Sequence, residues 1–257
     1  MKRLALVIAS IFLAAIHVQA EETIIVGATP VPHAEILEQV KPLLAEKGYK
    51  LEIKEFTDYV IPNLALDDGD LDANFFQHRP YLLEFNKNKN TKLVATVNVH
   101  LEPMGVYSHK IKNLADLPIG ASVAVPNDPT NESRALEVLV NAGLITLKDA
   151  EFKTKLDVAE NPKKLSFKEI DAPQLPRVLD DVDIAVINTN YALPAGLNPV
   201  KDALAIESKD SPYANIIVVK EGKENDPKTK ALNEAITSDK IRLFIQEKYN
   251  GAIIEAF

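Results

Sequence analysis

The sequence predicts an α/β protein built from two runs of alternating strands and helices. The first run opens with a compact apolar strand at residues 23–29, continues with a helix at 33–47 and returns in a strand at 51–56. The second run opens with a strand at 122–126, and a late strand at 211–222 leads back towards the first run. Because strand, helix and strand form the βαβ unit, the two runs predict two α/β lobes.

The helix at 33–47 follows from apolar residues at helical spacing. Its predicted buried stripe consists of Ile36, Leu37, Val40, Leu43 and Leu44. Pro42 lies inside this pattern and is expected to kink or split the helix, because it lacks an N–H and crowds the carbonyl of Glu38. Gly48 follows as a stop signal.

The next segments predict where the chain passes between lobes. Residues 93–99 form a further strand, 103–108 form an extended segment, and 109–120 make the first passage into the second lobe. Residues 228–257 read as two helices that are split near 237–239. We therefore expect a signal peptide at 1–20, a first lobe at 21–108 plus 216–257, and a second lobe at 109–215.

Residues 1–20 have the pattern of a cleavable secretory signal peptide. Lys2 and Arg3 precede an apolar run at 4–16, and Val18 and Ala20 occupy the small-residue positions of a cleavage site. The apolar run is shorter than the roughly 18–20 residues that span a bilayer, which favours cleavage after Ala20 over a membrane anchor.

Composition excludes several classes of partner and site. The chain has 257 residues, of which 46% are hydrophobic and 26% charged, as is ordinary for a globular protein. Residues 21–257 carry 27 basic and 37 acidic side chains, a formal charge of −10, which argues against binding to nucleic acid. The absence of Cys excludes disulfides, CxxC redox sites and thiolate metal sites.

The stretch 56–82 concentrates aromatic and polar side chains. Its pattern predicts a helix at 59–66, a turn at 67–70 and a strand at 71–76 that runs into a new helix near Pro80. The residues of interest are Phe56, Tyr59, Asn63, Asn74, Phe75, Phe76, Gln77, His78 and Tyr81. Flat apolar walls with polar edges at a strand end suit a small molecule with an apolar tail. The alternative is that these aromatic residues belong to the core.

The helix after residues 122–126 presents a second candidate site. Asp128 is a good N-cap, and Pro129 then falls at the first helical position, where its missing donor costs nothing. The free N–H groups of this helix end suit a carboxylate, and Arg134 could grip one in bidentate fashion. The alternative for Arg134 is a surface ion pair that contributes little.

A third group of polar residues follows a predicted strand at 183–187, which comes after a strand at 165–170 and a helix near 173–180. Asn188, Thr189 and Asn190 are placed at the carboxyl end of that strand, where ligands bind in such sheets. An Asn amide offers both a donor and an acceptor. The alternative is that these residues only cap the next helix.

These segments also resemble a known family. The stretches VPNDPTNESRAL, ENPKKL, DAPQLPR, AVINTNYA and SPYANIIV, together with 56–82, resemble the methionine-binding components of bacterial ABC importers, the MetQ/NlpA lipoprotein family. The resemblance covers nearly all of the chain after Ala20 in the same order. Family members usually carry a lipidated Cys at the cleavage site. Because this sequence has no lipobox Cys, we expect a mature protein that is free in the periplasm, the alternative being a tether of another kind.

The resemblance implies a two-domain periplasmic-binding-protein fold (type II-like) with a ligand cleft between the lobes. It implies binding of methionine, as the L or D enantiomer or a close relative, and delivery to the permease/ATPase complex of an ABC importer. Arg134 would take the α-carboxylate of the ligand. The other implied ligand-binding residues are Tyr59, Phe76, His78 and Tyr81 around the thioether tail, and Asn131, Asn188 and Asn215 in the polar shell.

Two other function classes stay open from the residues themselves. A hydrolase would need a site such as the Asp70/Asp72 pair, but the sequence has no G-x-S-x-G, no H-E-x-x-H and no Cys nucleophile. A metal carrier would use His33, His78, His100 and His109, which lack paired spacing. We therefore expect no enzyme activity, no cofactor and no metal. The alternative is a binding protein for a different small amino acid, a dipeptide or a metal ion.

Overall fold

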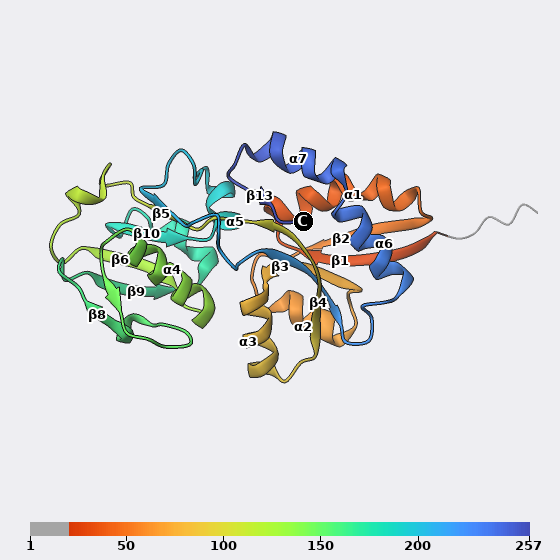
Figure 1. Ribbon diagram of the computed structural model, residues 1–257, viewed down its shortest axis with the longest axis horizontal. Coiled ribbons are helices and arrows are strands. Elements are labelled where there is room, and N and C mark those ends of the chain that lie inside the picture. Colours follow the sequence, from red (N-terminus) through yellow and green to blue (C-terminus); the bar gives the residue numbers. More distant parts are fainter. Residues whose placement is uncertain (1–20) are drawn as a thin grey trace, which may run out of the picture.

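The computed structural model describes residues 21–257, and its strands form two main sheets (Figure 1). The first sheet has six strands in the order β13-β4-β12-β3-β1-β2. These are β1 (Glu22–Ala28), β2 (Tyr49–Glu55), β3 (Ala73–His78), β4 (Leu93–Leu101), β12 (Asn215–Lys220) and β13 (Ile254–Glu255). β2 and β3 run parallel to β1, whereas β12 lies antiparallel between β3 and β4. A late segment of the chain therefore completes the first sheet.

Helices cover both faces of this sheet (Figure 1). They are α1 (Glu35–Ala45), α6 (Pro227–Ile236) and α7 (Asp239–Tyr249) on one face, and α2 (Ile61–Asp68) and α3 (Arg79–Lys89) on the other. Successive side chains of a strand point to opposite faces. In β12, Ile217 and Val219 accordingly pack with the first group of helices, and Ile216 and Val218 pack with the second.

Pro42 does not split the helix, one of the two effects that we expected of it, because α1 continues through this residue as one element. Proline removes one hydrogen bond inside a helix. The apolar stripe around it, however, is fully buried at Ile36, Leu37, Val40 and Leu44. Burial of such side chains contributes roughly 1.5–3 kcal/mol each, which outweighs the defect.

The second sheet has five strands in the order β11-β5-β10-β6-β9. These are β5 (Gly105–Tyr107), β6 (Ser122–Pro126), β9 (Ser166–Ile170), β10 (Ile184–Ile187) and β11 (Ala205–Ile206). Two helices, α4 (Pro129–Asn141) and α5 (Thr189–Ala192), follow β6 and β10, and a small hairpin joins β7 (Thr146–Leu147) to β8 (Val158–Glu160). The helix expected near 173–180 is a 3₁₀ helix at Ala172–Val178, because Pro173 and Pro176 cannot donate α-helical hydrogen bonds.

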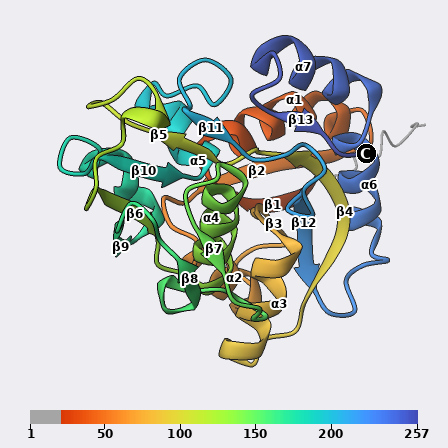
Figure 2. The same ribbon diagram turned by 60° about the vertical axis from the view of Figure 1, so that its left-hand side comes forward.

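The chain crosses between the sheets twice. One crossing lies between β4 and β5, and the other lies between β11 and β12. β5, which we expected at the end of the first lobe, forms its hydrogen bonds with β10 and β11 in the second sheet. We therefore propose that the lobes meet near residues 102–104 and 207–214. Figure 2 shows α4 of the second lobe beside α3 of the first, and the two helices are in contact.

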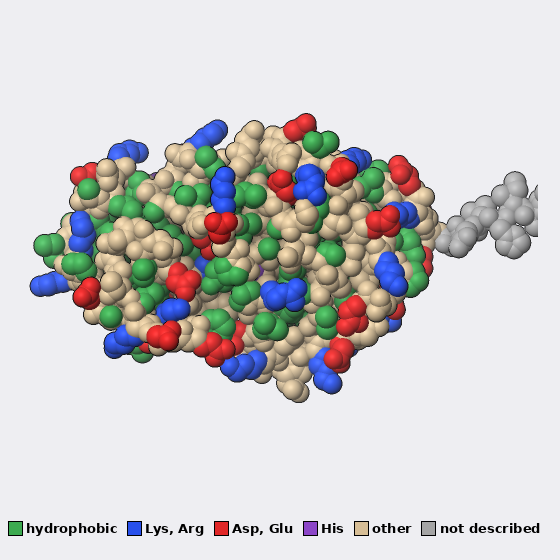
Figure 3. All heavy atoms as spheres, viewed as in Figure 1, with side chains coloured by type: hydrophobic (Ala, Val, Ile, Leu, Met, Phe, Trp, Pro, Cys, Tyr) green, Lys and Arg blue, Asp and Glu red, His purple; other side chains and the backbone are tan. Residues whose placement is uncertain are grey.

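Charged side chains of both signs are interspersed over the face of the molecule in Figure 3. No helix within residues 21–257 is both long and apolar enough to cross a membrane.

Candidate functional site

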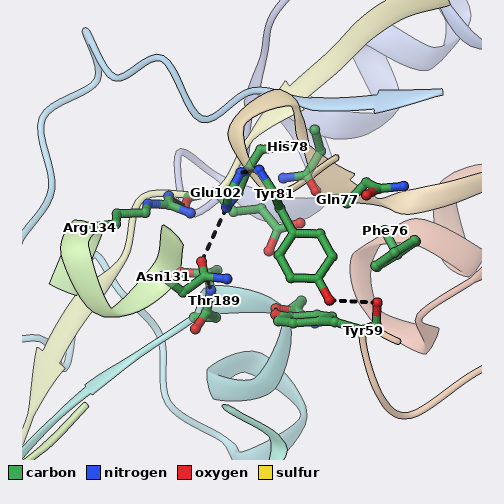
Figure 4. Close-up of a pocket in the computed structure, with 12 residues that line it drawn as sticks. Tyr59, Phe76, Gln77, His78, Tyr81, Glu102, Asn131, Arg134 and Thr189 are labelled. Atoms are coloured by element: carbon green, nitrogen blue, oxygen red, sulfur yellow. Dashed lines mark hydrogen bonds between the residues drawn. The ribbon is translucent and has the colours of Figure 1, made fainter. Parts of the chain in front are cut away.

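A small cavity with a volume of about 20 Å³ lies between the two sheets (Figure 4). It is lined by Tyr59, Phe76, Gln77, His78, Tyr81, Glu102, Asn131, Arg134, Asn188, Thr189, Asn190 and Asn215. The structure thus brings together all eight residues that we predicted to bind a ligand, although their contacts with a ligand stay a prediction. Gln77, Glu102, Thr189 and Asn190 were absent from that set.

The junction of β3 and α3 places one wall of the cavity. β3 is buried along its whole length, and its last residue, His78, caps α3 by accepting a hydrogen bond from the backbone N–H of Tyr81 at 3.2 Å. Pro80 falls in the first turn, where a missing donor is tolerated. The cap therefore fixes both the imidazole and the first turn of α3, which carries Tyr81 over the cavity.

Three rings form a continuous aromatic wall. The ring centroid of Tyr59 lies 6.0 Å from that of Phe76 and 5.8 Å from that of Tyr81, and the Phe76 and Tyr81 centroids are 6.1 Å apart. The Tyr81 hydroxyl donates to the Tyr59 carbonyl at 2.9 Å, which holds the two segments together. Figure 4 shows these rings on one side of the cavity, opposite Asn131 and Arg134. We define Tyr59, Phe76 and Tyr81 as the aromatic wall.

The opposite side begins at the N-terminus of α4. Asp128 accepts hydrogen bonds from the backbone N–H and the side-chain amide of Asn131, each at 3.0 Å. The amide of Asn131 is therefore turned so that its Oδ1 faces the cavity. This oxygen accepts from Asn188 Nδ2 at 2.9 Å and from His78 Nε2 at 3.2 Å. Burial and then the nearby Arg134 lower the pKa of His78 to about 3, so its imidazole is neutral at pH 7.

Arg134 is buried, with 3% of its surface exposed, and so is not the surface ion pair that was the alternative. Its Nε and Nη2 donate to the carboxylate of Glu207 at 2.9 and 2.5 Å, and Nη2 also donates to the Glu102 carbonyl at 2.7 Å. The edge expected to grip a ligand carboxylate is thus already occupied. Nη1 has no hydrogen-bond partner within residues 21–257 and is the nitrogen left for a ligand.

Glu102 is the most informative of the residues that the sequence did not single out. It is 4% exposed and lies where the chain leaves β4 for the second sheet. Burial raises the pKa of its carboxyl, while His33, Arg134 and a backbone hydrogen bond at Asn190 oppose that rise. The signal in the sequence was a lone carboxylate in the otherwise apolar run that joins two strands.

Two buried polar atoms at this cavity have no hydrogen-bond partner in the part of the chain that the structure describes. They are Asn188 Oδ1 and Asn190 Nδ2. Asn188 uses its Nδ2 on Asn131, and Asn190 uses its Oδ1 to accept from the Tyr59 hydroxyl at 2.6 Å. A buried polar group without a partner costs about 1–3 kcal/mol. The cavity therefore offers one free acceptor, Asn188 Oδ1, and one free donor, Asn190 Nδ2.

Comparison with known proteins places this geometry in context. A relative from Bacillus subtilis (strain 168), the methionine-binding lipoprotein MetQ, is 47% identical over 243 residues, covering 91% of this chain and 88% of the relative. The structure of a nutrient-binding protein from Burkholderia cenocepacia bound to methionine is similar with a TM-score of 0.89 and 49% identity, over 91% of this chain and 100% of that one. An ABC transporter periplasmic substrate-binding protein from Coxiella burnetii gives 0.88 and 45%, with the same coverage. These structures confirm the predicted two-lobe binding-protein fold.

One prediction is corrected by these comparisons. We expected a mature protein that is free in the periplasm, but the relative from B. subtilis is named a lipoprotein, as is the matched family. That prediction was wrong because it rested on the absence of a lipobox Cys alone, and it concerned residues 1–20, which lie outside the described residues together with the cleavage site after Ala20. The sequence profile described as NlpA lipoprotein matches residues 24–257, and the chain belongs to this family.

Proposed function

We propose that this protein is the substrate-binding protein of an ABC importer and that it binds methionine in the cavity between its lobes. The observation that carries the proposal is the pairing of an aromatic wall with unsatisfied donors and acceptors in one buried space. An amino acid with an apolar side chain matches both halves of that space. The relatives from B. subtilis and B. cenocepacia, whose names or titles state methionine, support the same ligand.

The aromatic wall suits a thioether tail. A sulfur atom against an aromatic ring gains about 0.3–1.5 kcal/mol per contact. Burial of the side chain adds roughly 1.5–3 kcal/mol. The neutral imidazole of His78 extends the wall towards the polar end of the cavity, because its ring centroid lies 6.3 Å from that of Tyr81.

The polar end suits the charged headgroup of an amino acid. We assign the carboxylate to Arg134 Nη1, and the ammonium to the carboxylate of Glu102 and to Asn188 Oδ1. Asn190 and Asn215 supply further amide donors. Asn131 contributes by orienting Asn188. Hydrogen bonds to charged groups contribute about 1.5–3 kcal/mol each, which fits binding in the micromolar to nanomolar range, about −8 to −12 kcal/mol.

The same geometry favours a carrier over an enzyme. His78 is a weak base, because its pKa is about 3, and Glu102 Oε1 is hydrogen-bonded to His100 Nε2 at 2.8 Å. We propose that the protein has no catalytic activity and releases its ligand unchanged to a membrane permease/ATPase complex. The similarity to the C. burnetii transporter component supports this partner.

Calorimetry on protein that has been unfolded, freed of ligand and refolded tests the proposal. We expect saturable heat with L-methionine, D-methionine or both, and weaker binding of norleucine, in which a methylene replaces the sulfur. A methionine dipeptide serves as the competing ligand. Absence of heat with both enantiomers would end the methionine assignment. Tighter binding of the dipeptide than of methionine would identify peptides as the ligands of the protein.

A further inference from the structure

Two buried histidines converge on one oxygen of Glu102 behind the cavity. His33 lies in the turn Pro30–Ala34 that precedes α1, and His100 lies in β4. His33 Nε2 is 3.2 Å from Glu102 Oε1, and His100 Nε2 is 2.8 Å from the same oxygen. Neither imidazole is exposed to solvent and neither lines the cavity. Their only route to the ligand is therefore through Glu102 and its neighbours.

The hydrogen-bond pattern determines which imidazole nitrogens carry protons. To pair with a ligand ammonium, Glu102 must be ionised, and an ionised carboxylate only accepts hydrogen bonds, so His100 Nε2 then donates to it at 2.8 Å. His33 Nε2 donates to the amide oxygen of Asn215 at 3.1 Å and lies 3.2 Å from Glu102 Oε1. For His33 this leaves Nδ1 as an acceptor, and the Thr29 hydroxyl lies 2.7 Å from it, in position to donate. Burial lowers the pKa of His33 to about 4 and that of His100 to about 3, so both are neutral at pH 7. Neutral histidines add no positive charge beside Glu102, whose nearby cation is Arg134.

His33 also reaches a second residue of the cavity. Its Nε2 lies 3.1 Å from Asn215 Oδ1, at the start of β12. Because the amide oxygen faces the imidazole, the amide nitrogen of Asn215 is turned the other way, and no hydrogen bond from this nitrogen to residues 21–257 occupies it. One imidazole thus sets the direction of an amide donor and lies against a carboxylate of the same cavity.

A metal ion is the competing interpretation of this cluster. The candidate ligand atoms of His33, His100 and Glu102 all lie within 4.8 Å of one another, and two histidines with a carboxylate form a common zinc set. However, His100 Nε2 is hydrogen-bonded to Glu102 Oε1 at 2.8 Å, and His33 Nε2 is hydrogen-bonded to Asn215 Oδ1 at 3.1 Å while facing Glu102 Oε1 at 3.2 Å. Hydrogen bonds therefore account for the Nε2 atoms of both histidines without a metal, whereas His100 Nδ1 has no partner within residues 21–257.

We propose that His33 and His100 are positioning residues that hold Glu102 for the ammonium group of the ligand, and that His33 in addition orients Asn215. This inference rests on the proposed function of the same cavity. It predicts that the two histidines control recognition of the headgroup and leave recognition of the tail untouched.

The proposal is tested by measuring how two variants of His33 bind methionine and its des-amino analogue. His33→Phe removes the donor but keeps a ring, whereas His33→Gln retains an N–H close to the position of Nε2. We expect His33→Phe to weaken methionine binding by about tenfold or more. Binding of 4-(methylthio)butanoate, the des-amino analogue, should weaken less than binding of methionine, since it has no ammonium to lose and only its carboxylate senses the orientation of Asn215. His33→Gln should restore most of the loss, and His109→Phe, at an exposed histidine, serves as the matched control.

The outcomes separate this inference from the proposed function. Failure of the unaltered protein to bind methionine would overturn the proposed function itself. If the unaltered protein binds but His33→Phe weakens both ligands equally, or His33→Gln behaves as His33→Phe does, the positioning role is refuted. Stoichiometric zinc in the purified protein, lost in His33→Phe, would also refute it in favour of the metal.

A measurement on the unaltered protein covers the case in which His33→Phe does not fold. Nitrogen-15 NMR of the imidazoles at pH 7 should show His33 and His100 as neutral Nε2–H tautomers. The Nε2–H signals should shift on addition of methionine and shift less with the des-amino analogue. A Nδ1–H tautomer at either residue, or equal shifts with both ligands, contradicts the proposal.

Discussion

The two sides of the cavity are built in different ways. The aromatic wall comes from one stretch of 23 residues, Tyr59 to Tyr81, on elements of the first lobe. The polar side is assembled from separate segments of both lobes, namely the first crossing, α4, the end of β10 and the start of β12. Its principal members are Glu102, Asn131, Arg134, Asn188 and Asn215. The wall is thus a property of one lobe, whereas the polar side exists only when the lobes meet.

Contacts between the lobes show how the two sides are coupled. The Tyr59 hydroxyl donates to Asn190 Oδ1 at 2.6 Å, and the Tyr191 hydroxyl donates to the Thr57 carbonyl at 3.2 Å. The Tyr59 and Tyr191 ring centroids are 5.1 Å apart. Tyr59, a member of the aromatic wall, is therefore held directly against the second lobe.

Substitution of Arg134 should have the largest effect. It should lower both the affinity for methionine and the free energy of unfolding. Arg134→Leu leaves the carboxylate of Glu207 buried, where hydrogen bonds from Ser211 and from the backbone of Met104 hold it. Removing one partner of a buried ion pair costs about 3–5 kcal/mol. We expect urea denaturation to show a loss of that order, and calorimetry to show no methionine binding.

The control for this experiment is Arg177→Leu, at an exposed arginine of the second lobe. It should change the free energy of unfolding by less than about 0.5 kcal/mol. If Arg134→Leu were as stable as this control, the ion pair with Glu207 would not stabilise the second lobe.

The same difference explains what the sequence could and could not predict. The stretch 56–82 is contiguous, so local periodicity was enough to place its strand and its rings. The residues of the polar side lie far apart in the chain, and only resemblance to a family joined Arg134 to Asn188 and Asn215. The occupation of Arg134 by Glu207 was not predictable, because the two residues are 73 positions apart and meet only through the fold.

Glu102, at the first crossing, also could not be assigned to the site from local sequence pattern. Glu102 and the histidines behind it lie in different elements, and neither His33 nor His100 has a sequence spacing typical of a site. The effect of proline was harder to predict than periodicity, since the apolar stripe carried α1 through Pro42 whereas Pro173 and Pro176 reduced a predicted helix to a 3₁₀ helix.

The stability of the protein should depend on pH through His78, the buried histidine that lines the cavity. The ordinary pKa of an imidazole is 6.5, whereas burial and then Arg134 lower that of His78 to about 3. Between these values the unfolded chain binds more protons than the folded one, so stability falls as the pH falls from about 6.5 towards 3. His78 should contribute about 1.4 kcal/mol per pH unit to this loss.

Comparison of the unaltered protein with His78→Gln isolates this contribution. The carboxyls of Glu102 and Asp128, whose pKa values are raised by burial, act in the opposite direction in both proteins. We expect urea denaturation between pH 4 and 6 to give the variant a shallower dependence by about 1.4 kcal/mol per pH unit. Equal slopes would mean that His78 is not kept neutral by the fold. His109→Gln, at an exposed histidine, is the matched control.

Neutralising Glu102 tests the polar side without changing its shape. Glu102→Gln removes the charge that we assign to the ligand ammonium and should weaken methionine binding by about 10- to 100-fold, since hydrogen bonds to charged groups contribute about 1.5–3 kcal/mol. Calorimetry should show a smaller change for the des-amino analogue. Glu160→Gln, on the exposed strand β8, removes a charge of the same sign and should leave both affinities unchanged. Equal losses for both ligands would place the ammonium elsewhere.

The smallest expected effect belongs to the aromatic wall. Phe76→Leu keeps the wall apolar but removes the ring from a sulfur–aromatic contact that contributes about 0.3–1.5 kcal/mol. The preference for methionine over norleucine should therefore fall by about 2- to 12-fold. Phe85→Leu makes the same change at a buried ring of α3 that does not line the cavity, and should leave the preference intact. Because norleucine has the same headgroup, the ratio of the two affinities is insensitive to the polar side. If the ratio stays constant in Phe76→Leu, the ring of Phe76 does not recognise the sulfur, and the wall contributes apolar burial alone.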